Sequence, residues 1–343
     1  MNNLNCELYN QPFSHIYIEK EALHHPKTEQ ILSHFKHSTI IQIDHYKDVF
    51  NRAGQSFITQ KQSQNLILAI KKQSFLYKGA PVCQDFGYDN FYYTSNIMNC
   101  IYDCEYCYLQ GMYPSGNIVC FVNLEDFFHE VTQLLENMPL YICISYDTDL
   151  LALESITGFV REWIAFAHKH PNLTVELRTK SCNYKSIADI TPTNNFILAW
   201  TLSPNDIIQQ YEHHTPDYAA RINSINHAIQ DGWTVRLCFD PLLHVKNEIH
   251  LYQTWIKQVF QDIKPACIKD VSVGIFRISK EYLKVMRKHR PHSVITQYPY
   301  CNDNGVCHYA NHISNQLVEE VTRTVAQYID QTKIFIWKDS DKE

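Results

Sequence analysis

The sequence has little glycine and no long apolar run. Only nine glycines occur in 343 residues. Neither a G-x-G-x-x-G dinucleotide fingerprint nor a G-x-x-x-x-G-K-[ST] phosphate loop is present, which excludes both of these nucleotide-binding motifs. No apolar run reaches the roughly 18 residues that a membrane helix needs, and the first residues lack the basic stretch and apolar core of a secretory signal. We therefore expect a soluble, cytoplasmic protein with no membrane partner.

The sequence also lacks an excess of positive charge. Its net charge is −6, which is unlike a generic polyanion binder, although a local basic patch could still serve a specific nucleic acid. The twelve cysteines, without a secretory signal, indicate reduced thiols or metal ligands rather than a disulfide framework. The composition predicts an intracellular enzyme with a metal or cluster site.

From about residue 90 onward, short apolar runs alternate with longer segments of helical period. Helices are expected over 154–168 and 217–230. The expected strands are 140–145, 173–178, 196–202, 234–239 and 271–276. Strands that alternate with helices indicate parallel strands joined by helical crossovers. The pattern favours an α/β fold with a partly or fully closed β/α barrel, and a doubly wound open sheet is the alternative.

The rest of the chain divides around this pattern. We expect residues 1–85 to form an N-terminal extension packed on the core, with a helical segment at 66–70. Residues 86–290 carry the barrel, and residues 291–343 form a C-terminal extension. No internal repeat and no Gly/Ser linker separates these parts.

Three cysteines stand close together as C-x3-C-x2-C, at Cys100, Cys104 and Cys107. Thiolates are preferred ligands of iron–sulfur clusters and of zinc. A structural zinc site normally has a fourth Cys or His nearby, and none follows here. Three ligands leave one coordination position open, which favours catalysis. The alternative is a cysteine-rich loop of buried, inert thiols.

This triplet, with Tyr106 just before its last cysteine, resembles the radical S-adenosylmethionine superfamily. The string C-E-Y-C-Y-L-Q at 104–110 is similar to that of the spore photoproduct lyase family. The resemblance implies a partial barrel of radical S-adenosylmethionine type and a [4Fe–4S] cluster held by Cys100, Cys104 and Cys107. The open iron would chelate S-adenosylmethionine. One electron from a reductant would then yield a 5′-deoxyadenosyl radical, and the substrate would be a thymine photoproduct in DNA.

Shorter strings extend the resemblance from about 90 to about 290. They are D-L-L-A-L-E at 149–154, R-T-K at 178–180, W-T-L-S at 200–203 and G-I-F-R at 274–277. The resemblance implies that Lys180 pairs with the cofactor carboxylate and that Thr148 and Thr201 donate hydrogen bonds to the cofactor. It also implies that Tyr106 lies near the cofactor and that Tyr106 and Tyr108 help to pass the radical along.

The sequence departs from the family where a cysteine should open a C-T-S-D string and return a hydrogen atom to the product. The string here is Y-D-T-D, so Tyr146 occupies the donor position. Cys143 lies three residues earlier, where a continuous strand would turn it to the opposite face. The other free thiols considered are Cys120, Cys182 and Cys238. The phenol of Tyr146 could itself act as the donor.

Two further groups could bind ligands. Cys301, Cys307, His308 and His312 are soft ligands, but their spacing fits no standard zinc finger and the enclosed N-D-N-G reads as a turn. The basic run 280–290, followed by Tyr298 and Tyr300, could contact phosphates and stack on displaced bases. Its alternative is a solvated helix face.

Asp240, followed by Pro241 at the end of an expected strand, is a candidate acid of the pocket. It could equally cap the segment that follows.

The leading hypothesis is therefore a radical lyase of the spore photoproduct lyase type that repairs DNA. The second is a radical enzyme of the same family with another substrate, suggested by Tyr146. The third is a zinc-binding module with no radical chemistry.

Overall fold

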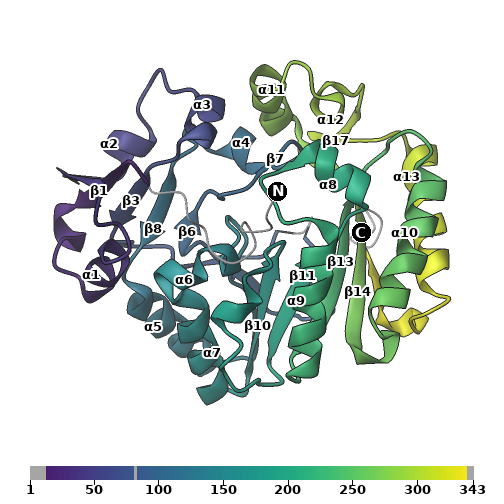
Figure 1. The fold of residues 1–343 in the computed structure, drawn as a ribbon, viewed down its shortest axis with the longest axis horizontal. Helices are drawn as coiled ribbons and strands as arrows, with labels where there is room; N and C mark the ends of the chain where they lie inside the picture. Colours follow the sequence, from purple (N-terminus) through teal and green to yellow (C-terminus); the bar gives the residue numbers. More distant parts are fainter. Residues whose placement is uncertain (1–12, 81–82, 338–343) are drawn as a thin grey trace.

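The computed structural model describes residues 13–80 and 83–337 (Figure 1). Within them, the main sheet has eight strands in the order β18-β14-β13-β11-β10-β9-β5-β4. Its strands are β4 (Leu76–Lys78), β5 (Phe91–Thr94), β9 (Leu140–Cys143), β10 (Leu173–Thr179), β11 (Phe196–Thr201), β13 (Thr234–Leu242), β14 (Ile268–Ile275) and β18 (Ile334–Ile336). All neighbours pair in parallel except β4, which runs antiparallel to β5.

Helices connect the parallel strands and flank them around the sheet (Figure 1). These are α5 (Leu124–Leu135), α7 (Phe159–Lys169), α9 (Tyr218–Gln230), α10 (Glu248–Asp262) and α13 (Asn311–Val325). From β5 to β14 the strands lie side by side in chain order, as successive βα units require. The expected partial β/α barrel is confirmed.

The predicted barrel elements are present with shifted ends. Strand β9 ends at Cys143, two residues before the predicted end. The helix expected over 154–168 is divided at Gly158, whose φ of +67° separates α6 (Glu154–Thr157) from α7. Asp217 begins α9 by accepting a hydrogen bond from the Ala220 amide.

A second sheet lies at the left of Figure 1, with the strand order β2-β1-β3-β8-β6. Its strands are β1 (His15–Glu19), β2 (Thr39–Ile43), β3 (Leu66–Ala69), β6 (Ile97–Met98) and β8 (Ile118–Phe121). The prediction of a helix at 66–70 is wrong, because this stretch is strand β3. Every residue of β3 is buried, and a short apolar run buried on both faces has no periodicity that distinguishes strand from helix.

The second sheet positions the cysteine segment. Strands β6 and β8 pair antiparallel at its edge, so the chain between them leaves from and returns to one place. That stretch carries the three cysteines, β7 (Asp103–Cys104) and α4 (Leu109–Met112). The loop is thus held at both ends by a sheet that is not part of the barrel.

The remaining helices are short and lie in the connections between strands. They are α1 (Pro26–Leu32), α2 (Lys47–Phe50), α3 (Phe57–Gln62), α8 (Asn205–Tyr211), α11 (Lys280–His289) and α12 (Val294–Gln297). Three short strands form a small sheet: β15 (Arg277–Ser279), β16 (Cys301–Asp303) and β17 (Val306–His308). Helices α11 and α12 lie between β15 and β16 in the sequence.

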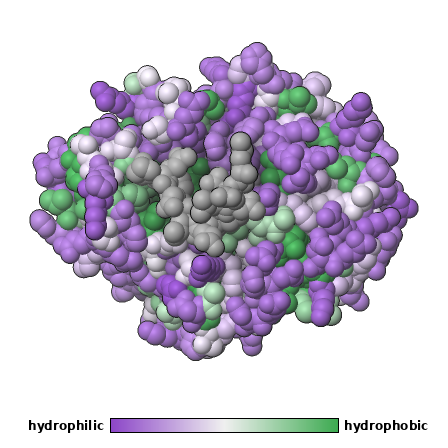
Figure 2. Space-filling view, viewed as in Figure 1, coloured by the Kyte–Doolittle hydropathy of each residue, from purple (hydrophilic) through white to green (hydrophobic). Residues whose placement is uncertain are grey.

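The outer surface is mainly polar on the face shown in Figure 2, with scattered apolar residues. None of the helices in the described ranges is both long and apolar enough to span a bilayer.

Candidate active site

One cavity of about 630 Å³ lies where the barrel strands end. Its walls come from the cysteine loop, from the C-terminal parts of β9, β10, β11 and β13, from the residues that follow β9 and β10, and from Phe335 and Trp337 near the C-terminus. The carboxyl ends of parallel β/α strands are the usual place for chemistry because loops from several strands meet there.

Cys100, Cys104 and Cys107 all line this cavity. The loop that carries them is tied down on two sides. Strand β7 pairs with β12 (Glu212–His213), and the Lys61 ammonium donates hydrogen bonds to the carbonyl oxygens of Cys100 and Tyr102. A buried cation beside three thiolates offsets part of the charge that a cluster would bring.

Burial raises the pKa of the Cys100 thiol to about 11 and raises the pKa values of Cys104 and Cys107. These thiols stay protonated at neutral pH unless a metal displaces their protons. Among the residues described, no three His, Cys, Asp or Glu side chains form a group suited to one metal ion. Zinc needs its ligands about 2.3 Å from a single point, so the zinc hypothesis gains no support.

Tyr106 anchors the cysteine loop. Its hydroxyl donates to Glu212 at 2.5 Å, and Glu212 also accepts from Ser203 at 2.8 Å and from Arg221 at 2.5 Å. Although burial opposes its charge, Arg221 and Lys180 lower the pKa of Glu212 to about 2. The side chains of Glu212 and Arg221 are both 0% exposed. Tyr106, expected to be catalytic, therefore has its hydroxyl engaged in a structural ion-pair network while its ring lines the cavity.

The three residues expected to hold the cofactor line the same cavity: Thr148, Lys180 and Thr201. Asp149 organises this wall by accepting from the Lys180 amide at 2.6 Å and from the Thr179 hydroxyl at 2.7 Å. The Lys180 ammonium lies 5.4 Å from the centre of the Tyr106 ring.

Thr148 has a buried hydroxyl with no hydrogen-bond partner in the described ranges. Because buried polar atoms are almost always satisfied, this hydroxyl indicates a place for a polar ligand. On the same wall, burial opposes the charge of Lys180, but Cys104, once deprotonated, and Glu212 outweigh burial and raise the pKa of Lys180. The donor set thus fits a carboxylate-bearing ligand next to the cysteine loop.

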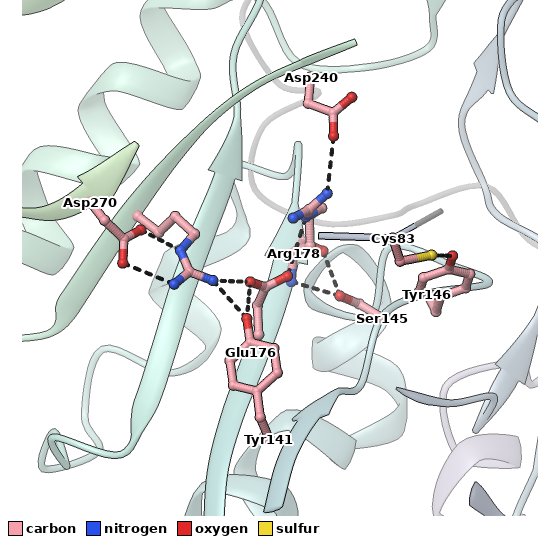
Figure 3. A network of polar contacts seen from close by, with 9 residues as sticks. Cys83, Tyr141, Ser145, Tyr146, Glu176, Arg178, Asp240 and Asp270 are labelled. Atoms are coloured by element: carbon pink, nitrogen blue, oxygen red, sulfur yellow. Dashed lines mark hydrogen bonds and ion pairs between the residues drawn. The ribbon is translucent and has the colours of Figure 1, made fainter. Parts of the chain in front are cut away.

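Another part of the cavity wall holds a thiol next to a phenol. Cys83 Sγ and Tyr146 Oη are 2.5 Å apart, and Figure 3 shows the two side chains pointing at one another. Tyr108 donates to the Tyr146 carbonyl at 2.6 Å, so a predicted tyrosine also reaches this end. Sequence reasoning missed Cys83, which stands alone in a loop 63 residues before Tyr146.

Cys143 and Tyr146 both line the cavity, so the expectation that they face opposite ways is wrong. Strand β9 ends at Cys143, and the alternation of a strand no longer applies to the residues after it. Cys238 is fully buried on β13, and Cys120 is buried in the second sheet. Neither of these, nor Cys182, is among the described residues that line the cavity. Cys83 is the thiol that the structure adds.

A row of alternating charges runs beside the cavity (Figure 3). Asp270 pairs with Arg236, Arg236 pairs with Glu176 at 2.5 Å, and Glu176 lies 3.3 Å from Arg178. Arg178 reaches Asp240 at 3.6 Å. Such pairing offsets the cost of burying the individual charges.

Asp240 is part of the cavity wall, as the pocket-acid interpretation expected. Its carboxylate lies over Gly274, where a Cβ would come within 2.8 Å of it. This close approach explains the glycine of the G-I-F-R string.

The cysteines and histidines between 301 and 312 do not come together as a metal site in the described part of the chain. Cys301 is exposed and Cys307 is buried, while His308 contacts Asp303 at 2.8 Å. His312 joins no metal-binding group in the described part of the chain.

The basic run 280–290 is only partly available for phosphate. Arg287 donates to the carbonyls of Thr296 and Tyr298, and Arg290 pairs with Asp103 at 2.5 Å. Both arginines therefore hold loops in place. The exposed cations of α11 are Lys280, Lys284 and Lys288.

Tyr298 and Tyr300 pack on each other and on buried Tyr309, with ring centres 5.0 Å apart in each pair. They belong to an aromatic cluster. The expectation that they stack on displaced bases gains no support.

Comparison with known proteins agrees with this geometry. The family model described as spore photoproduct lyase matches residues 11–334. The spore photoproduct lyase of Clostridium acetobutylicum is 23% identical over 270 residues, which cover 75% of this chain and 74% of that protein.

Solved structures with the same fold include two spore photoproduct lyase variants. One contains a dinucleoside spore photoproduct and has a TM-score of 0.82. The other contains AdoMet and the dinucleoside and has a TM-score of 0.81. Each is 16% identical, and each match covers 96% of this chain and 99% of the other. Because the family model spans nearly the whole sequence, this chain belongs to the spore photoproduct lyase family.

Proposed function

We propose that this protein is a radical S-adenosylmethionine lyase that repairs a thymine photoproduct in DNA. One observation carries the proposal: a single cavity brings together the three cysteines of the C-x3-C-x2-C motif, the unpartnered hydroxyl of Thr148 and a thiol–phenol pair. Family membership supports it. In this proposal residues 86–290 carry the cluster and cofactor sites, 1–85 pack on them and supply Cys83, and 291–343 complete the C-terminal side. The enzyme acts in the cytoplasm.

Cys100, Cys104 and Cys107 would hold a [4Fe–4S] cluster with one iron left open. Lys180 would pair with the carboxylate of S-adenosylmethionine, and Thr148 and Thr201 would donate hydrogen bonds to it. When bound, these groups supply a carbon-centred 5′-deoxyadenosyl radical after one-electron reduction. The protein itself supplies a closed, low-dielectric wall, because Tyr106, Glu212 and Asp149 are all buried.

Hydrogen return would use Cys83 rather than a cysteine at position 146. The Cys83 S–H bond breaks, a C–H bond forms on the thymine radical, and a thiyl radical remains. One electron from the same reductant and one proton restore the thiol. Tyr146, in contact with the sulfur, fixes its position and can share the unpaired electron. Tyr108, whose hydroxyl donates to the Tyr146 carbonyl, joins this pair to the cluster motif.

The DNA backbone would approach along α11. Tyr282 of this helix lines the cavity. The exposed lysines of α11 form no ion pair with any residue that the structure describes, whereas Arg290 pairs with Asp103. Contacts of this kind position DNA without reading its sequence.

The test is anaerobic reconstitution with iron and sulfide, followed by dithionite, S-adenosylmethionine and a dinucleoside spore photoproduct. The proposal expects 5′-deoxyadenosine and two thymidine units as products. Formation of 5′-deoxyadenosine with an unchanged dinucleoside and an unchanged lesion in DNA would favour a different substrate. A colourless protein that binds zinc and makes neither product would overturn the radical assignment.

A further inference from the structure

A row of stacked tyrosines leads away from the thiol–phenol pair. The rings of Tyr146 and Tyr93 have centres 4.3 Å apart and planes inclined by 26°. The rings of Tyr93 and Tyr77 are 5.1 Å apart and inclined by 19°. Tyr77 and Tyr93 are direct cross-strand partners in β4 and β5, so the sheet register keeps them on one face.

The row connects the cavity with the second sheet. Tyr146 and Tyr93 line the cavity, whereas Tyr77 is not among the described lining residues and is partly exposed. Beyond Tyr77, the Lys71 ammonium donates to the Tyr77 hydroxyl at 3.2 Å. Lys71 follows β3 of the second sheet. The mechanism proposed above uses Tyr146 but neither Tyr93 nor Tyr77.

The surroundings keep these phenols neutral. Burial, with a smaller effect of the Asp147 carboxylate, raises the pKa of Tyr93 to about 12 and also raises the pKa of Tyr77. A neutral phenol that is oxidised must release a proton together with the electron. Burial lowers the pKa of Lys71, which donates to the Tyr77 hydroxyl at the outer end, to about 8.

We propose that Tyr93 and Tyr77 carry the unpaired electron away from the active site when a phenoxyl radical is left on Tyr146. This inference rests on the proposed radical function. The Tyr146 phenoxyl gains an electron and a proton while Tyr93 loses both, and Tyr93 is restored in the same way by Tyr77. A small-molecule thiol in solution then gives a hydrogen atom to Tyr77 and becomes a thiyl radical. The route spares the active site when no lesion takes up the radical.

The test compares the wild-type protein with Tyr93→Phe and Tyr77→Phe. Phenylalanine keeps the ring but has no O–H to oxidise. Tyr92→Phe is the matched control, because Tyr92 is the neighbour of Tyr93 on β5 and has no ring contact with the described aromatic residues. Each reconstituted protein is reduced in the presence of S-adenosylmethionine, without DNA and with a nitroso spin trap. Peptide mass mapping then locates the adducts.

The wild type and Tyr92→Phe should carry adducts at Tyr77. In Tyr93→Phe this label should fall at least tenfold while the label at Tyr146 rises. Equal labelling of Tyr77 in Tyr93→Phe, or labelling that stops at Tyr146 in the wild type, would overturn the route.

Failure of the proposed function would look different, because no 5′-deoxyadenosine would form. The same proteins are then oxidised with light and a soluble ruthenium polypyridyl complex. Oxidation now enters at the partly exposed Tyr77. Label at Tyr146 that is lost in Tyr93→Phe supports the route, and label that is retained contradicts it.

Discussion

The two ends of the cavity are built in different ways. At the cluster end, the cysteines lie within eight residues of sequence and their loop is tied to the fully buried pair of Glu212 and Arg221. At the hydrogen-return end, Cys83 and Tyr146 come from loops 63 residues apart and meet through one contact. Their side chains are only partly buried.

This difference indicates that the residue which returns the hydrogen atom can change more easily than the residues which hold the cluster. Holding a cluster needs several ligands at fixed spacing and a rigid support. Delivering a hydrogen atom needs one thiol within reach of the product, and any nearby loop can supply it. In the proposed mechanism, the tyrosine at position 146 leaves the cluster end intact, and Cys83 would supply the missing thiol from another loop.

The largest effect is expected from removing a cluster ligand. Cys104→Ala should abolish iron binding and 5′-deoxyadenosine formation, because two thiolates no longer define the site. Cys120→Ala is the matched control, since Cys120 is equally buried but lies in the second sheet. Iron content, visible absorbance and product analysis would check both. A Cys104→Ala protein that still makes 5′-deoxyadenosine contradicts the assignment of the cluster end.

Glu212→Gln should destabilise the protein by roughly 3 kcal/mol, because breaking a buried ion pair leaves the other charge uncompensated. Arg221 would keep its charge at 0% exposure. Urea unfolding, followed by circular dichroism, measures this change. Glu281→Gln on the exposed face of α11 should change the unfolding free energy by less than about 0.5 kcal/mol. Similar small effects for both variants would show that the cluster end is not held by this pair.

The same carboxylate predicts a pH dependence of stability. The pKa of Glu212 is about 2 in the folded protein, below its ordinary value of 4.5. Below pH 4.5 the unfolded chain therefore binds the proton first. The contribution of Glu212 is complete above pH 4.5 and is lost as the pH falls toward 2. Unfolding midpoints measured from pH 6 to pH 3 should fall less steeply in Glu212→Gln than in the wild type. Parallel curves would contradict the lowered pKa.

A smaller effect is expected at the cofactor wall. Lys180→Met keeps the apolar stem but removes the charge, and charge-assisted hydrogen bonds contribute about 1.5–3 kcal/mol. The Kd for S-adenosylmethionine should therefore rise roughly 10- to 100-fold with the cluster retained. Calorimetric titration of the reconstituted protein measures it, with the exposed Lys264→Met as control. An unchanged Kd would remove Lys180 from the proposed cofactor site.

The sequence predicted the barrel and the grouping of the three cysteines well, because both are encoded locally. Alternating strands and helices indicate parallel crossovers, and C-x3-C-x2-C brings three thiols into one loop. The helix predicted at 66–70 failed because LILA is buried on every side as β3. Pattern alone cannot distinguish a buried strand from a buried helix over so few residues.

The hydrogen-return end could not be predicted for a different reason. The contact between Cys83 and Tyr146 depends on tertiary folding across 63 residues, and no spacing rule applies at that separation. The stacked partners of Tyr146 could not be predicted for the same reason, because Tyr93 and Tyr77 come from other parts of the folded chain. The Thr148 hydroxyl could be named from the resemblance, but its lack of a partner is a property of the folded chain.

The most direct measurement compares Cys83→Ala with Tyr146→Phe in the reconstituted enzyme supplied with a dinucleoside spore photoproduct. If the two ends of the cavity have separate tasks, Cys83→Ala should still make 5′-deoxyadenosine while thymidine formation falls by at least tenfold. Tyr146→Phe should keep most of its repair activity, because the thiol remains. Full repair by Cys83→Ala, or its loss only in Tyr146→Phe, would contradict the assignment of hydrogen return to the thiol.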